Sequence, residues 1–320
     1  MSTTLNNETP STNLRRQRQI ESTPATQLRQ SFCAMRVSFN WLGTRKSLSC
    51  DQRQEAAEPF GAEQSFISAG KKLIDTGHPA VRAVNQLKRQ VVETWRNASL
   101  PYPEPGMRLV RHNDVAELTE KMQQYRLQLE TAVSDLEAAY DEIKQQARVR
   151  LGRLFCASDY PSSLTDTFQM YWEFPNVEPP DYLRQLSPEI YQQECQRVRQ
   201  RFDEAVQLAE QAFVEELSSL VSHLSERLSG SDDGKPKVFR DSALGNLREF
   251  FERFQRLNIA SNSEIDDLVL RAQSIVSGVQ PNALRTSDSL RQQVVSQLSG
   301  VQSVLDGLMV DRPRRRILRS

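Results

Sequence analysis

The residues of this chain that could carry chemistry are few, and their spacing fits no common metal site. Its three histidines, His78, His112 and His223, have no second histidine, cysteine or carboxylate at the spacing that a metal-ligand set needs. The four cysteines lie far apart and form no Cys-x-x-Cys pair, which argues against zinc and against a disulfide-stapled secreted module. These cysteines are Cys33, Cys50, Cys156 and Cys195. We therefore expect no metal and no cofactor.

The sequence also lacks a complete phosphate loop and a familiar nucleophile. Gly70-Lys71-Lys72 places lysine after glycine, but the Walker pattern needs glycine at Ser65 and serine or threonine at Lys72. No Gly-x-Ser-x-Gly elbow and no cysteine-histidine signature of nucleophilic catalysis occurs. We expect that the chain is not an enzyme. One catalytic alternative stays open, a hydrolase with an unrecognised site among Asp159, Tyr160, Asp181 and Tyr182.

An arginine cluster at the C-terminal end is the strongest local charge feature. Five arginines within eight residues create a positive field that could hold a nucleic-acid backbone or an acidic partner. No basic stripe interleaved with aromatic residues accompanies them, and Ile317 and Leu318 among them suggest a short docking peptide. A solvated tail, a protein-docking tail and a nucleic-acid contact all stay open. The arginines are Arg312, Arg314, Arg315, Arg316 and Arg319.

The composition is typical of a globular protein with no net charge and therefore no strong overall electrostatic field. The 320 residues are 38% hydrophobic, and 41 basic residues balance 41 acidic ones. No global charge would therefore draw the chain to nucleic acid or to an anionic membrane. No run of about 18 apolar residues could cross a bilayer, and the N-terminus has no apolar core of the signal-peptide kind. We expect a soluble, cytoplasmic protein.

The elements that must position these residues are mainly helices. We expect a disordered tail at 1–31, a small β-ribbon region at 32–78, an elongated helical bundle at 79–310 and a basic tail at 311–320. In the ribbon region, Met35, Val37, Phe39 and Trp41 alternate with polar residues as in a half-buried strand, and a second run near 66–74 could pair with it.

Two long apolar stripes dominate the bundle. From about 113 to 155 and from about 187 to 229, apolar residues recur at steps of three or four, which predicts two long amphipathic helices. Each stripe resembles a coiled-coil seam and needs a cover, so we expect the two helices to pack as an antiparallel hairpin. A helix from Pro79 and three shorter helices after residue 242 complete the bundle, and homo-oligomerisation through the seam stays open.

The connector between the long helices is rich in aromatic and proline residues. Such a loop is usually functional or packed on itself, so these rings are either a partner-docking surface or a seal for the end of the hairpin. Residues 168–174 could form a short strand. The docking candidates are Tyr160, Phe168, Trp172, Phe174 and Tyr182.

Several phrases of the sequence resemble a known family. They are Ser68-Ala69-Gly70-Lys71-Lys72, Leu154-Phe155 with Ser158-Asp159-Tyr160-Pro161, and Gly278-Val279 with Leu284-Arg285. Together they are similar to an uncharacterised bacterial and phage family, domain of unknown function 3150, past the N-terminal tail. The resemblance implies a protein partner, an AAA+ ATPase of the MoxR type or a von Willebrand A-domain protein. It assigns no functional residue.

These observations favour a non-enzymatic interaction protein, a helical scaffold or adaptor that works in a multiprotein assembly. The alternative is a nucleic-acid-binding protein that uses the C-terminal arginine cluster.

Overall fold

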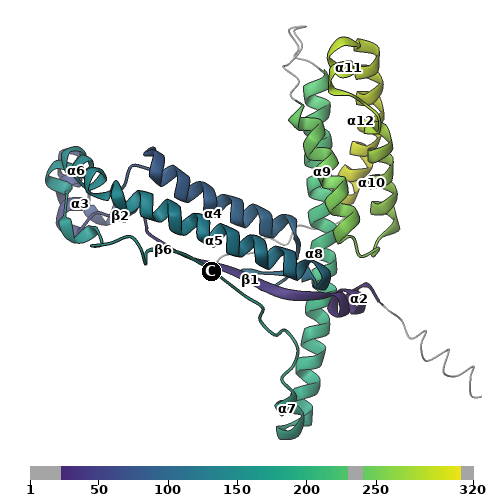
Figure 1. The fold of residues 1–320 in the computed structure, drawn as a ribbon, viewed down its shortest axis with the longest axis horizontal. Coiled ribbons are helices and arrows are strands. Elements are labelled where there is room, and N and C mark those ends of the chain that lie inside the picture. The colour runs from purple at the N-terminus through teal and green to yellow at the C-terminus, as the bar shows by residue number, and fades with distance from the viewer. Residues whose placement is uncertain (1–22, 230–240, 311–320) are drawn as a thin grey trace, which may run out of the picture. The chain divides into compact units, whose positions relative to one another are not determined.

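The computed structural model describes residues 23–229 and 241–310 (Figure 1). The fold is mainly helical, with a four-stranded antiparallel sheet in the order β4-β5-β1-β6 and a separate β2-β3 ribbon. Within the described residues, no helix is long and apolar enough to cross a membrane. The chain divides into two compact units, and strand β1 starts in the first and continues into the second.

Among the described residues, the first unit combines 23–34, 99–112, 176–229 and 241–310. Its elements are α2 (Pro24–Ser31), the start of β1 (Phe32–Trp41), β4 (Ser99–Pro101), β5 (Met107–Arg111), α7 (Asp181–Leu186), α8 (Pro188–Ser229), α9 (Ser242–Leu257), α10 (Ser263–Val276), α11 (Pro281–Thr286) and α12 (Asp288–Val310). The second unit holds the rest of β1, β2 (Arg45–Ser47), α3 (Cys50–Ala57), β3 (Gly70–Lys72), α4 (Pro79–Asn97), α5 (Val115–Ala138), α6 (Tyr140–Leu151) and β6 (Phe168–Glu173).

Part of the predicted disordered tail is helical. Residues 1–22 of that tail lie outside the described residues, but 24–31 form α2. The Thr23 hydroxyl accepts a hydrogen bond from the Thr26 N–H, and Pro24 occupies the first helical position, so the helix start is well capped. Leu28 is fully buried and packs in the core of the first unit. The prediction of disorder is therefore wrong for 24–31, because this short segment gains a tertiary partner.

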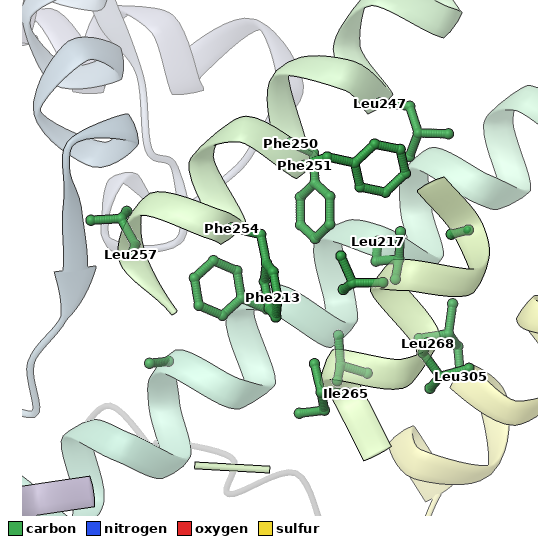
Figure 2. Packing of buried hydrophobic residues seen from close by; sticks show 14 of the residues in the cluster. Phe213, Leu217, Leu247, Phe250, Phe251, Phe254, Leu257, Ile265, Leu268 and Leu305 are labelled. Atoms are coloured by element: carbon green, nitrogen blue, oxygen red, sulfur yellow. The ribbon is translucent and has the colours of Figure 1, made fainter. Parts of the chain in front are cut away.

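The core of the first unit gathers around α8, which packs against α12, α2 and α9. Its apolar residues at helical spacing are buried from Val198 to Leu228. Phe213 of α8 meets Phe250 and Phe254 of α9, with ring centroids 6.3 and 4.9 Å apart (Figure 2). Edge-on aromatic contacts of this kind add stability beyond the buried area. The three shorter helices predicted after residue 242 are present as α9, α10 and α12.

The predicted hairpin of two long helices is wrong. The run at 113–155 breaks at Ala139 into α5 and α6, which belong to the second unit, whereas α8 belongs to the first. The stripe of α5 packs on α4, and the stripe of α8 packs on α12 and α2. Apolar burial has no directional preference, so a stripe accepts any matching stripe, and the sequence period does not say which one.

In the second unit, a two-stranded layer lies against a helix pair. Strand β1 pairs with β6 so that Val37, Phe39 and Trp41 lie opposite Trp172, Met170 and Phe168 on one face. The Lys88 ammonium of α4 lies 4.6 Å from the Trp41 ring centre, and the Arg126 guanidinium of α5 lies 4.1 Å from that of Trp172. The aromatic face of the layer therefore meets α4 and α5.

The predicted strand at 168–174 is confirmed as β6, but the predicted ribbon has other partners. The first alternating run is β1, and its partner in the second unit is β6 rather than the run near 66–74. That run contributes β3, which pairs with β2.

We expect Phe250→Ala to lower the free energy of unfolding by about 3–5 kcal/mol, because it removes a large ring from a site that is 1% exposed. Urea denaturation followed by circular dichroism measures this. Leu270→Ala, at a position 60% exposed, is the control and should change stability by less than about 0.5 kcal/mol. Equal losses in the two variants would contradict the packing around α9.

Candidate functional site

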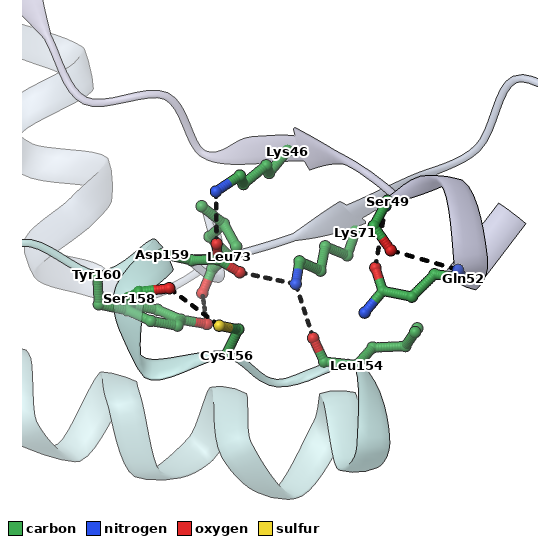
Figure 3. A network of polar contacts seen from close by, with 10 residues as sticks. All are labelled: Lys46, Ser49, Gln52, Lys71, Leu73, Leu154, Cys156, Ser158, Asp159 and Tyr160. Carbon is green, nitrogen blue, oxygen red and sulfur yellow. Dashed lines mark hydrogen bonds and ion pairs between the residues drawn. The ribbon is translucent and has the colours of Figure 1, made fainter.

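A buried ion-pair network in the second unit joins two of the sequence segments that carry the family resemblance, 68–72 and 158–161 (Figure 3). Lys46 and Lys71 lie directly opposite each other on the β2-β3 ribbon. Two like charges at such positions repel each other unless an anion lies between them. The Asp159 carboxylate is that anion, with Oδ1 2.6 Å from Lys46 Nζ and Oδ2 2.7 Å from Lys71 Nζ.

The inner half of this network is closed to solvent. The side chains of Lys71 and Asp159 are 5% and 4% exposed, and Lys71 Nζ also donates to the Leu154 carbonyl at 2.8 Å. Lys46 is 56% exposed, so the network opens to water on its side. Hydrogen bonds, chiefly from Lys46 and also from Lys71, hold the pKa of the Asp159 carboxyl below its usual range. The charges are satisfied within the fold, which indicates a structural clamp.

Tyr160, a predicted docking residue, belongs to this clamp. Its ring stacks on Phe155 with centroids 5.2 Å apart, and its hydroxyl donates to the Leu73 carbonyl at 3.0 Å. It is buried, and burial raises its pKa. Tyr160 therefore ties the connector to the segment after β3 and offers no exposed ring to a partner. Nearby Cys156 is exposed, and a hydrogen bond with the Ser158 hydroxyl lowers the pKa of its thiol.

A chain of contacts continues along the connector from the clamp to β6. The Tyr140 hydroxyl donates to the Pro161 carbonyl at 3.1 Å, and burial raises the pKa of Tyr140 to about 12. The Leu164 N–H donates to the Glu137 carboxylate at 2.5 Å, and the Leu164 side chain is fully buried. The segment is thus fixed to α5 and α6 just before β6 begins.

Between α5 and this fixed segment lies a groove of about 670 Å³, which we call the α5–β6 groove. Its apolar lining residues come from both sides and are buried: Leu129, Val133, Phe168 and Met170. Its polar lining residues are Arg126, Glu130, Ser134, Glu137, Thr165, Asp166, Gln169 and Tyr171. The four buried apolar residues form the floor of the groove, and the polar residues form its rim.

The groove opens on the outer side of β6. No residue of β1 lines it, and β6 is the last strand in the sheet order. Among the described strands, only β1 pairs with β6. The outer edge of β6 is therefore the boundary of the groove that faces away from β1.

Acidic groups outnumber basic ones around the α5–β6 groove. Arg126, its cation, is held over the Trp172 ring, and Glu137 is engaged by the Leu164 N–H. Asp166 accepts from the Gln169 amide at 3.3 Å. Glu130 is exposed, and its carboxylate has no hydrogen bond or ion pair within residues 23–229 and 241–310. Three carboxylates against one guanidinium favour a cationic ligand.

The other predicted docking residues differ in position and exposure. Phe168 is buried in the floor of the groove, and Trp172 is half-buried beneath Arg126. Phe174 is exposed just after β6, and Tyr182 is exposed on α7 of the first unit. Of the five predicted residues, Tyr160 and Phe168 are therefore buried, whereas Phe174 and Tyr182 have exposed rings. The predicted arginine contacts, Arg312, Arg314, Arg315, Arg316 and Arg319, lie outside the described residues.

The four residues of the catalytic alternative are divided between the two units. Asp159 and Tyr160 are engaged in the clamp, while Asp181 and Tyr182 belong to the other unit. Within the described part of the chain, no group of three or more His, Cys, Asp or Glu residues could hold a metal ion. Sequence reasoning missed Leu129, Glu130 and Val133 as site residues, because their spacing reads simply as the buried face and flank of a helix.

No family model, curated protein or solved structure matches the chain. The resemblance to the uncharacterised family therefore stays a prediction.

We expect Asp159→Asn to lower the free energy of unfolding by about 3 kcal/mol, at the low end for breaking a buried pair, because the network opens to water at Lys46. Urea denaturation at neutral pH measures the loss. Lys46→Met, on the exposed side, should cost much less. The double variant Lys71→Met with Asp159→Leu should recover part of the loss, and a double variant less stable than Asp159→Asn would contradict the clamp.

The contribution of Asp159 should also depend on pH. Its pKa is lower in the folded chain than in the unfolded one, so the unfolded chain takes up the proton first as pH falls. The stabilisation is present above about pH 4, the ordinary aspartate pKa, and is lost as pH falls through the folded-state value. The stability difference between wild type and Asp159→Asn should therefore shrink below about pH 4. A difference that stays constant from pH 7 to pH 3 would refute this.

Proposed function

We propose that this chain is a non-enzymatic interaction protein, a scaffold or adaptor that binds a protein partner in the α5–β6 groove. The observation that carries the proposal is the apolar floor of this groove beside the outer edge of β6, which pairs with no other strand among the described residues. Apolar side chains at the centre of a polar rim are the arrangement that protein interfaces use for their energetically important contacts.

The lining residues favour binding over reaction. The side chains at the floor are hydrocarbon, aromatic and thioether groups, which supply burial energy but transfer no proton and attack no bond. Two of the polar groups, Glu137 and Arg126, already position the connector and β6. Tyr171, half-exposed at the rim, is an aromatic residue of the kind that anchors an incoming partner.

The AAA+ ATPase and the von Willebrand A-domain protein implied by the family resemblance are the first partners to test. As a non-enzymatic helical protein, the chain would serve such an ATPase as adaptor or substrate. Nucleic-acid binding through the C-terminal arginines is the alternative, and it predicts salt-sensitive binding that deletion of residues 311–320 abolishes.

We expect Ser134→Trp to weaken partner binding at least tenfold, because the new indole would fill the α5–β6 groove from an exposed position on α5. The matched control is Gln128→Trp, an exposed position on the same helix that does not line the groove. Partners captured from a lysate by the full chain are identified by mass spectrometry, purified and titrated against the three proteins.

Selective loss with Ser134→Trp supports the proposal. Equal affinity of all three proteins for every purified partner, or capture of nucleic acid alone, contradicts it.

A further inference from the structure

We infer that the α5–β6 groove binds an extended peptide as an added strand along β6, with an arginine or lysine of that peptide opposite Glu130. This inference rests on the proposed function, and it names the chemistry of the partner. It is carried by the strand edge, the alternation of side chains along β6 and the charge of the rim.

The edge of β6 is open to pairing. A strand at the end of a sheet has unpaired N–H and C=O groups along its outer side, which attract another extended chain. Natural edges are usually protected by lysine, proline or a bulge, but Phe168–Glu173 contains no lysine or proline and pairs with β1 in continuous register. Its one charged residue, Glu173, is already paired with Arg36. The edge is therefore suited to accept a strand of about six residues, roughly 20 Å long.

Side-chain alternation would bring every second residue of the peptide into the groove. On β6, Phe168 and Met170 face α5 and line the floor, while Gln169 and Tyr171, which alternate with them, line the rim of the groove. An added strand continues this alternation, so its own alternate side chains would meet Leu129 and Val133 of α5. The groove volume of about 670 Å³ is large enough for the side chains of a short peptide.

The negative charge of the rim favours a peptide with a basic side chain. The Arg126 guanidinium lies over the Trp172 ring, so its positive charge stays at that end of the groove. Glu130 is exposed and has no partner in residues 23–229 and 241–310, and Asp166 lies on the opposite wall. An arginine can lay its aliphatic stem along the apolar floor and place its guanidinium at Glu130. A glutamate at the same position would meet like charge.

The test uses fluorescein-labelled Thr-Ile-Thr-Arg-Thr-Ile-Thr and the same peptide with glutamate in place of arginine. We expect the arginine peptide to bind the full-length chain at least tenfold more tightly in anisotropy titrations, with an affinity that falls as salt rises. Glu130→Arg should reverse this preference. The matched control Glu120→Arg, at an exposed position on the same helix outside the groove, should leave it unchanged.

Backbone pairing is tested with two N-methylated forms of the arginine peptide, each methylated at one alternate set of amides. Strand addition predicts that one form loses binding at least tenfold while the other retains it, because only one set donates to β6. If neither form loses affinity, or if none of the peptides binds, strand addition is overturned. The loss of a purified partner with Ser134→Trp would still stand in that case, so the two proposals fail separately.

Discussion

Two lysines that face each other across a short ribbon, Lys46 and Lys71, create the electrostatic constraint on which the second unit depends. Burying an ammonium without an anion is costly, and Asp159 provides the anion from the connector after α6. The connector is consequently bound to the ribbon at its beginning. From there, contacts through Tyr160, Pro161 and Leu164 fix its path as far as β6.

The α5–β6 groove is a consequence of that path. The connector is fastened to α5 at Glu137 through backbone and hydroxyl donors before the chain enters β6. Beyond this point the side chains of Phe168 and Met170 meet α5 without filling the space beside it. A rigid wall on each side leaves an apolar floor that is already shaped before any ligand arrives. Preorganisation of this kind lowers the entropy that a partner must lose on binding.

The first unit is stabilised differently, by burial of the apolar stripe of α8. Its long helix α8 has an apolar stripe from Val198 to Leu228, and several helices from distant parts of the chain cover it. The rings of Phe213, Phe250 and Phe254 fill the contact between α8 and α9. This core is held mainly by apolar packing, whereas the second unit also contains a buried ion pair.

Local sequence determined most of the long elements, but α2 formed where disorder is predicted and the helical run at 113–155 breaks at Ala139. The spacing of apolar residues in α4, α5, α8 and the shorter helices, and the alternation in β1 and β6, follow from the geometry of one helix or one strand. Tertiary structure alone decided the partners: α8 with α12 and α2, β1 with β6, and Asp159 between Lys46 and Lys71. Apolar burial is non-directional, and an ion pair between residues far apart in the sequence leaves no local periodicity. The spacing of residues therefore does not predict which elements or charges will pair. The candidate site was beyond sequence reasoning for the same reason, because Glu130 and Leu129 become a rim and a floor only when β6 lies beside α5.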